Sequence, residues 1–270
     1  MPPTDDSKLL EALLPVAVAA GREAHAIYLR GCPVEHKADR SPVTEADHAA
    51  EAVILAHLAE LAPQIPVVAE ESCAAGRIPA VDAVFFLVDP LDGTKEFIAR
   101  RGDFTVNIAL VRAGTPVIGV VYAPVAGMLY AGDVPAARAF RCAQPADGSV
   151  AGARQALHVR PVPPAGLTAV VSRSHATPET EQYLGGYSVH ERVSVGSSLK
   201  FCLVASGEAD LYPRLGPTME WDTAAGHAVL SAAGGQVLAP GGQPLRYGKP
   251  DFRNTYFIAA GAFPLVPLAA

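Results

Sequence analysis

Hydrophobic and polar positions along the first half of the chain change from a helical to an extended pattern. Residues 9–20 are apolar and Ala-rich with charged residues around them, which predicts an N-terminal helix over 7–30. A second helical pattern covers about 44–61. Short runs rich in β-branched and aromatic residues then predict strands over 65–69, 83–88, 104–111, 116–122 and 128–131. This order predicts an α+β first half.

The second half alternates between strand and helix patterns. It follows an Ala-, Pro- and Gly-rich stretch over 134–166, which we interpret as a meander and linker. We expect strands at 167–171, 188–193, 209–212, near 236 and near 255, and helices at 178–184, 197–206 and 222–233. Such alternation is typical of α/β folds. The sequence therefore predicts a layered, mixed α+β and α/β sandwich, with an α+β domain over 1–150 and an α/β domain over 151–270.

Composition and charge limit the cellular compartments and the kinds of binding partner that fit this sequence. Half of the 270 residues are apolar, which is enough for a sizeable core, and the net charge of −6 argues against long nucleic acids, which need a basic face. The four cysteines form no C-x-x-C pair, as expected of a reduced intracellular protein. Asp5 and Asp6 before the first apolar run have the wrong charge for a signal peptide, and the run is too short to span a bilayer. We expect a cytoplasmic protein without a transmembrane segment.

The segment Asp89-Pro90-Leu91-Asp92-Gly93-Thr94 follows an apolar strand directly and carries the strongest chemical signal. We expect a tight turn that aims Asp89, Asp92 and the Leu91 carbonyl at one point, as hard cations such as Mg²⁺ require. If a helix starts near Gly93, its free N–H groups suit a phosphate. The alternative is a capped strand-to-helix turn, because Asp and Thr are ordinary capping residues.

Three further carboxylate positions add to this signal. Glu70, followed by a second glutamate, ends the preceding strand and could lie beside Asp89. Asp222 opens an Ala-rich helix, and Asp47 lies near the start of another. Each has a plain alternative: a solvated loop for the glutamate pair, an N-cap for Asp222 and a helix N-terminal acid for Asp47.

Together these segments resemble the inositol monophosphatase-like family of Mg²⁺-dependent, lithium-sensitive phosphatases. Residues 69–72, 89–94 and 221–226 carry the resemblance, in the family's order and over nearly the whole chain. Within the family the chain is most similar to the 3′(2′),5′-bisphosphate nucleotidase branch, the CysQ proteins, through residues 94–97, 172–175, 196–201 and 212–214. An inositol phosphatase would more usually carry Thr-Asn-Phe after Asp-Gly-Thr.

The resemblance implies an αβαβα sandwich of the inositol monophosphatase and sugar phosphatase type, with two or more Mg²⁺ ions in its active site. Glu70, Asp89 and the Leu91 carbonyl would hold one ion. Asp89, Asp92 and Asp222 would hold a second. The two ions would flank the scissile phosphate, one beside the attacking water and the other beside the leaving oxygen.

The resemblance also implies roles in catalysis and in substrate binding. Thr94, with Asp47 or Glu70 behind it, would orient the attacking water, and the N–H groups of Gly93 and Thr94 would bind the phosphate. The nucleotide and its second phosphate would be held by His175, Ser197, Lys200 and Arg214. Without the resemblance, His175 would be interpreted as a helix-start residue, and Lys200 and Arg214 as surface charges. The expected substrate-binding set also includes Glu70, Leu91, Asp92 and Asp222.

The resemblance implies hydrolysis of adenosine 3′,5′-bisphosphate to AMP and phosphate, in sulfate assimilation. An inositol monophosphatase or sugar phosphatase of the same fold is the nearest alternative. A non-catalytic metal or nucleotide binder is the alternative from another class, and a water-positioning set of Thr94, Asp47 and Glu70 argues against it. Homodimers are common in the family, and peripheral attachment to the inner face of the membrane is left open.

Overall fold

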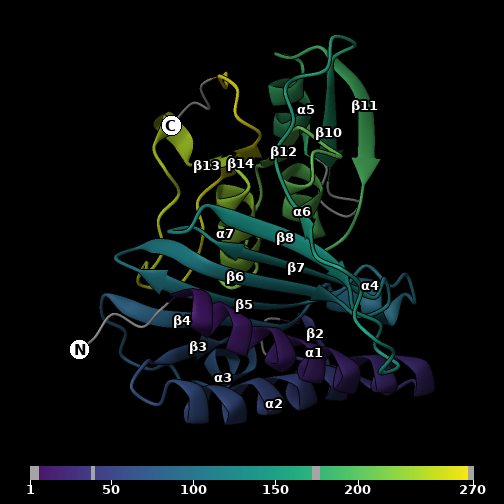
Figure 1. Ribbon diagram of the computed structural model, residues 1–270, viewed down its shortest axis with the longest axis vertical. Helices are drawn as coiled ribbons and strands as arrows, with labels where there is room; N and C mark the ends of the chain where they lie inside the picture. The colour runs from purple at the N-terminus through teal and green to yellow at the C-terminus, as the bar shows by residue number, and fades with distance from the viewer. Residues whose placement is uncertain (1–5, 38–39, 172–176, 267–270) are drawn as a thin grey trace.

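The first of two large sheets is a long antiparallel meander with one parallel strand at its edge. The computed structural model describes residues 6–37, 40–171 and 177–266 (Figure 1). The strands lie in chain order, and only the first pair is parallel. They are β3 (Val67–Ala69), β4 (Val84–Asp92), β5 (Thr105–Arg112), β6 (Thr115–Ala123), β7 (Met128–Asp133), β8 (Arg138–Ala143) and β9 (Gln155–Ala156).

The second sheet has five strands in the order β11-β10-β12-β14-β13. Its strands are β10 (Leu167–Val171), β11 (Val189–Ser194), β12 (Leu211–Arg214), β13 (Gln236–Leu238) and β14 (Phe257–Ala260). A separate hairpin is formed by β1 (Val34–His36) and β2 (Pro42–Thr44).

Helices fill the layers around the two sheets. Helices α1 (Asp6–Arg30) and α2 (Glu45–Leu61) cover one face of the first sheet, while α6 (Leu199–Ala205) and α7 (Ala224–Ala232) lie between the sheets (Figure 1). Helix α5 (Pro178–Leu184) packs beside β12. The short elements α3 (Glu70–Ala74), α4 (Thr94–Ile98) and the 3₁₀ turn η1 (Pro240–Gly242) complete the chain. The αβαβα sandwich is confirmed.

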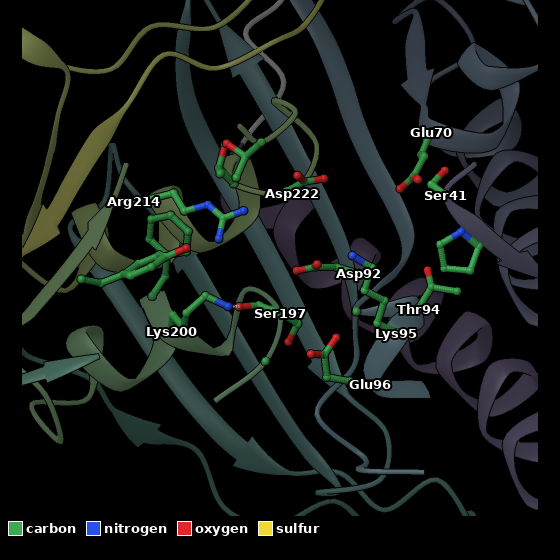
Figure 2. Close-up of a pocket in the computed structure, with 17 residues that line it drawn as sticks. Ser41, Glu70, Asp92, Thr94, Lys95, Glu96, Ser197, Lys200, Arg214 and Asp222 are labelled. Carbon is green, nitrogen blue, oxygen red and sulfur yellow. Dashed lines mark hydrogen bonds between the residues drawn. The ribbon is translucent and has the colours of Figure 1, made fainter. Parts of the chain in front are cut away.

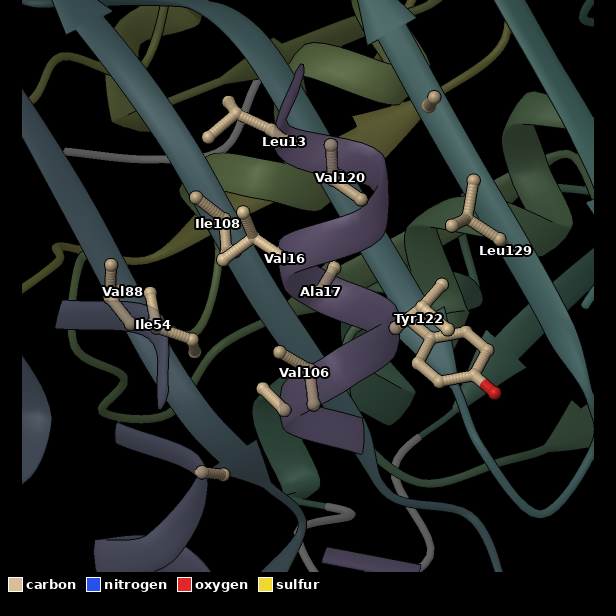
Figure 3. Close-up of a cluster of buried hydrophobic side chains, with 14 of the residues drawn as sticks. Leu13, Val16, Ala17, Ile54, Val88, Val106, Ile108, Val120, Tyr122 and Leu129 are labelled. Carbon is tan, nitrogen blue, oxygen red and sulfur yellow. The ribbon is translucent and has the colours of Figure 1, made fainter. Parts of the chain in front are cut away.

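The core is densest where α1 crosses the middle strands of the first sheet. Val16 and Ala17 of α1 face Ile108 and Val120 of the sheet, and these side chains are almost completely buried (Figure 3). Strands β5 and β6 are buried on both faces, which explains why their sequences are continuous apolar runs rather than alternating ones.

Helix α7 packs on the opposite face of the same sheet, and glycines set how closely it approaches. A Cβ atom added at Gly119 would lie 2.2 Å from the Ala225 carbonyl oxygen, and one at Gly132 would lie 2.6 Å from the Val229 Cα. The helix backbone therefore rests directly on the strands. Because α7 begins just after Asp222, this contact also fixes where that carboxylate stands.

Several predicted boundaries differ from the observed ones. The expectation that the strand over 83–88 ends in a tight turn is wrong, because β4 continues to Asp92. Its pairing with β5 shifts register between Asp89 and Asp92, so the segment forms a bulge within the strand. The expected linker over 134–166 contains β8 and β9, which extend the first sheet. The domain division at residue 150 stays a prediction.

Candidate active site

Three carboxylates from separate elements meet at one point. Strands β3 and β4 run parallel, and Ala69 lies beside Val88. The next residues along the two chains, Glu70 and Asp89, therefore lie near each other, as the sequence predicted. Asp222 faces them from the turn before α7. One carboxylate oxygen from each of Glu70, Asp89 and Asp222 lies within 4.8 Å of the other two.

Asp92 reaches the same space from the far side of the bulge. It lines the pocket together with Glu70 and Asp222, and Figure 2 shows the three side chains directed into it. Asn107 Nδ2 lies 3.4 Å from Asp92 Oδ2, and Asp89 Oδ1 accepts a hydrogen bond from the Leu91 N–H at 3.0 Å. The bulge therefore places Asp89 and Asp92 around one space, although the backbone there is not the predicted turn.

Burial and mutual repulsion dominate the electrostatics of these acids. Burial, reinforced by the charges of Glu70, Asp92 and Asp222, raises the pKa of Asp89 well above its usual range. Burial and the charges of Asp92 and Glu70 raise the pKa of Asp222 well above its usual range, and burial raises the pKa of Asp92 to about 6. Like charges in a buried space are costly unless a cation compensates them. Oxygen donors of this kind are what a hard divalent cation prefers, so the residues present fit a metal centre.

Lys37 occupies one side of this cluster, and no pattern in the sequence predicted it. Its Nζ lies 2.6 Å from an oxygen of Glu70 and 2.6 Å from an oxygen of Glu71. Burial alone would lower the pKa of Lys37, but the two carboxylates outweigh it and raise that pKa. Burial also raises the pKa of Glu71, to about 7. Lys37 belongs to no motif and reaches the acids only because it follows β1 of the hairpin.

Thr94 and Asp47 form a hydrogen-bonded pair beside the cluster. Thr94 Oγ1 donates to Asp47 Oδ1 at 3.2 Å, and it also lies 3.4 Å from the Leu91 carbonyl oxygen. The other oxygen of Asp47 accepts from the N–H and the hydroxyl of Thr44, which completes a capping box at the start of α2. Asp47 is thus both a helix cap and the partner of Thr94.

The turn into α4 requires a glycine at position 93. Gly93 has φ +96°, and a Cβ atom there would lie 3.0 Å from the Asp103 carbonyl oxygen. Thr94 is the first residue of α4, so the N–H groups at Gly93 and Thr94 lie where a helix leaves such donors without internal partners. The expected helix start is confirmed, whereas the role of these N–H groups stays a prediction.

Cationic and polar groups face the acids across the same pocket. Lys200 Nζ donates to the Ser197 carbonyl at 2.6 Å, and burial lowers its pKa to about 8, so it remains mostly charged at neutral pH. Arg214 Nη2 donates to the Pro217 carbonyl at 3.0 Å. Figure 2 shows Ser197, Lys200 and Arg214 on the side of the pocket away from Glu70.

Two buried polar atoms in this group have no partner within the described part of the chain. They are Ser197 Oγ and Arg214 Nε. Ser197 also has φ +51°, a left-handed backbone that is uncommon for a residue with a side chain. Unpaired buried donors and local strain concentrate at binding sites, which agrees with the predicted substrate role of both residues. His175, the fourth residue of that prediction, lies outside the described residues.

One more acid in the pocket received no role from the sequence. Glu96 lines it beside Thr94 and Ser197 and is only 9 % exposed. It was visible as part of the motif over 94–97, but nothing in the spacing distinguished it from an ordinary helix-surface glutamate.

Elsewhere, none of the described helices is long and apolar enough to cross a bilayer.

Comparisons with known proteins agree with the site. A profile of the inositol monophosphatase family matches residues 5–263. The chain is 47 % identical over 241 residues to the 3′(2′),5′-bisphosphate nucleotidase CysQ of Shigella flexneri, covering 88 % of this chain and 94 % of that protein. It is 46 % identical over 257 residues to the enzyme of that name from Salmonella typhimurium, covering 92 % of this chain and all of the other.

A solved structure of the same family also matches the fold of this chain. The crystal structure of CysQ from Bacteroides thetaiotaomicron, described as a bacterial member of the inositol monophosphatase family, superposes with a TM-score of 0.80. The two sequences are 39 % identical, and the match covers 95 % of this chain and 98 % of the other.

Proposed function

The chain belongs to the inositol monophosphatase family, and on that basis we propose that it is a 3′(2′),5′-bisphosphate nucleotidase. It hydrolyses adenosine 3′,5′-bisphosphate to AMP and phosphate, a reaction of sulfate assimilation. The observation that carries this proposal is a pocket with two unlike ends. Its acidic end suits a metal-bound phosphate, while Lys200 and Arg214 at the other end suit a second phosphate.

Mg²⁺ is the ion we propose, with two ions in each site. Glu70, Asp89 and the Leu91 carbonyl hold one, and Asp89, Asp92 and Asp222 hold the other. Support comes from the mutual approach of Glu70, Asp89 and Asp222 and from the oxygen-only donor set. When bound, the ions supply the positive charge that makes a water molecule more acidic and stabilises the departing oxygen.

Thr94 orients the attacking water, and Asp47 accepts the hydrogen bond of the threonine. Because the Thr94 hydroxyl donates to Asp47 at 3.2 Å, its oxygen lone pairs stay available to accept a hydrogen bond from water. Thr94 Oγ1 makes this hydrogen bond to Asp47 and none to Glu70, which accepts one from Lys37 instead. This favours Asp47 over Glu70 behind the threonine.

The second phosphate, on the 5′ carbon, is bound by Lys200 and Arg214. A guanidinium offers a rigid fork of donors that matches phosphate oxygens, and the free Nε of Arg214 is one such donor. Ser197 Oγ, also without a partner among the described residues, lies in the same wall of the pocket and contributes a further polar contact. His175 stays in the proposed set on the family resemblance alone.

The decisive experiment compares substrates with and without the second phosphate. Arg214→Ala should lower kcat/KM for adenosine 3′,5′-bisphosphate by about tenfold to a hundredfold, because a charged hydrogen bond is worth about 1.5–3 kcal/mol. The loss should be much smaller for adenosine 3′-monophosphate. The exposed Arg101, changed to alanine, provides a matched control that should leave both substrates unaffected.

Two results would contradict the proposal. Wild-type protein that prefers inositol 1-phosphate over the bisphosphate would favour the inositol phosphatase alternative. An equal loss on both adenosine substrates in Arg214→Ala would mean that Arg214 supports the fold and does not bind the second phosphate. Assays of phosphate release with Mg²⁺ and with a chelator test the metal requirement in the same experiment.

We also propose a cytoplasmic location for the enzyme. Its four cysteines are all unpaired, as is usual for proteins kept in a reducing compartment. A homodimer stays a prediction from the family resemblance.

A further inference from the structure

Glu96 is a buried acid in a pocket that is proposed to bind an anion. The residue is 9 % exposed and lines the pocket, and no residue in the described part of the chain donates a hydrogen bond to its carboxylate. Figure 2 shows this carboxylate directed into the same space as the Ser197 side chain. A carboxylate that opens onto a binding pocket and has no partner among the described residues is free to accept a hydrogen bond from a bound ligand.

Packing holds Glu96 in place. A Cβ atom added at Gly196 would lie 2.8 Å from the Glu96 Cγ, so the stem of the glutamate lies directly against the glycine backbone. The next residue, Phe97, is buried and packs edge-on against Phe104, which anchors α4 to the sheet. The carboxylate is therefore presented from a fixed position rather than from a flexible arm.

The chemistry of a carboxylate limits what it can bind here. An ionised carboxylate accepts hydrogen bonds and donates none, so it repels a phosphate and attracts a hydroxyl group. Its negative charge acts on Lys200 by raising that residue's pKa, partly offsetting the effect of burial, but no hydrogen bond joins the two. The group it suits is a donor on the substrate that lies close to the metal end and away from Arg214.

We propose that Glu96 accepts a hydrogen bond from the ribose hydroxyl next to the scissile phosphate. A Cβ atom added at Gly93 would lie 3.5 Å from Glu96 Oε2, so the carboxylate lies beside the turn that joins Asp92 to Thr94 and faces the part of the substrate that adjoins the reacting phosphate. With a 3′-phosphate the hydroxyl is the 2′ one, and with a 2′-phosphate it is the 3′ one. Glu96 is thus a specificity residue that selects ribonucleotides over deoxyribonucleotides, an inference that rests on the proposed function.

The test compares adenosine 3′,5′-bisphosphate with 2′-deoxyadenosine 3′,5′-bisphosphate. Wild-type protein should prefer the ribonucleotide by about tenfold to a hundredfold in kcat/KM, as expected for a hydrogen bond to a charged acceptor. Glu96→Ala should remove most of this preference by slowing the ribonucleotide reaction alone. Glu96→Gln should keep part of it, because the amide oxygen still accepts a hydrogen bond without the charge.

Controls separate specificity from general damage. Glu60→Gln changes an exposed carboxylate of α2 and should leave both rates as in the wild type. Thermal unfolding of each variant checks the fold, and the nearly isosteric Glu96→Gln remains informative if the alanine variant does not fold. Mg²⁺ affinity, measured by titration calorimetry, should be unchanged in Glu96→Gln.

Three results would overturn the inference. Equal turnover of the ribo and deoxy substrates by wild-type protein would show that the hydroxyl is not recognised. An equal loss on both substrates in Glu96→Ala and Glu96→Gln would show that Glu96 acts through Lys200 or the fold. Failure of wild-type protein to hydrolyse either nucleotide, with turnover of inositol 1-phosphate, would overturn the proposed function as well.

Discussion

The pair formed by Thr94 and Asp47, proposed to position the attacking water, is where we expect single residues to matter most for the rate. We predict that Thr94→Ala lowers kcat by at least about a hundredfold while KM changes little, since orienting a water matters mainly in the transition state. Thr94→Ser keeps the hydroxyl that donates to Asp47 and should retain most of the activity. Steady-state kinetics on both variants measure this, and a loss confined to KM would mean that Thr94 only binds ground-state phosphate.

At the residue scale, the sequence predicted the acids better than their surroundings. The motif spacing marked Glu70, Asp89 and Asp222, because strand ends and helix starts place such residues predictably. Lys37 and Glu96 could not be assigned in the same way. Their contacts depend on how a hairpin and a short helix pack against distant parts of the chain.

At the scale of elements, α7 begins two residues after the proposed ligand Asp222. Its backbone rests on β6 at Gly119, so this contact helps to set where the Asp222 turn lies relative to Asp89 of β4. We predict that Gly119→Ala pushes α7 outward, because the added Cβ would lie 2.2 Å from the Ala225 carbonyl oxygen. Both the melting temperature and the Mg²⁺ affinity should fall.

A matched substitution on the other face of the sheet serves as the control. A Cβ atom at Gly21 of α1 would lie 2.4 Å from the buried Tyr122 ring, so Gly21→Ala should also lower the melting temperature. It should leave Mg²⁺ affinity intact, because α1 carries none of the proposed ligands. Equal changes of Mg²⁺ affinity in the two variants, measured by calorimetry, would refute a special role for α7.

Elements with clear end signals were the ones that the sequence predicted well. Helix α5 occupies the predicted 178–184, with Pro178 in its first turn and Thr177 as its cap. Strand β4 was predicted too short, because Pro90 and Gly93 are typical of turns. The chain instead accommodates Pro90 in a bulge, a feature that depends on the pairing with β5 and that local sequence does not encode.

On the scale of the whole molecule, the proposed metal centre joins the two halves of the chain. Most of its proposed ligands lie in β4, and Glu70 directly follows β3 of the same sheet, whereas Asp222 comes from the second half. We predict that Mg²⁺ at a hundred times its Kd raises the free energy of unfolding by about 2.7 kcal/mol for each ion bound. Asp222→Asn should lose most of this gain, and without metal it should be at least as stable as the wild type, because it removes a buried, repelled charge.

Thermal unfolding in chelator and in a series of Mg²⁺ concentrations measures both effects. Asp82→Asn, which changes an exposed aspartate, should respond to Mg²⁺ as the wild type does. The same Mg²⁺-dependent shift in Asp222→Asn and in the wild type would show that Asp222 is not a ligand. The layered fold was predictable from hydrophobic periodicity. That the metal centre joins the two halves could be inferred only from the order of the acidic motifs along the sequence.

The late position of Asp222 has a consequence for protein synthesis. The ribosome makes Glu70, Asp89 and Asp92 first, and Asp222 emerges only after on the order of 100 further residues. At about 5–20 residues per second, the nascent chain carries an incomplete acidic cluster for on the order of ten seconds. During translation the antiparallel strands β4 to β8 can pair with their immediate neighbours, while hydrolysis must wait for α7 to settle on them. A ribosome-bound fragment that stops before Asp222 is therefore expected to fold in part and to cleave nothing.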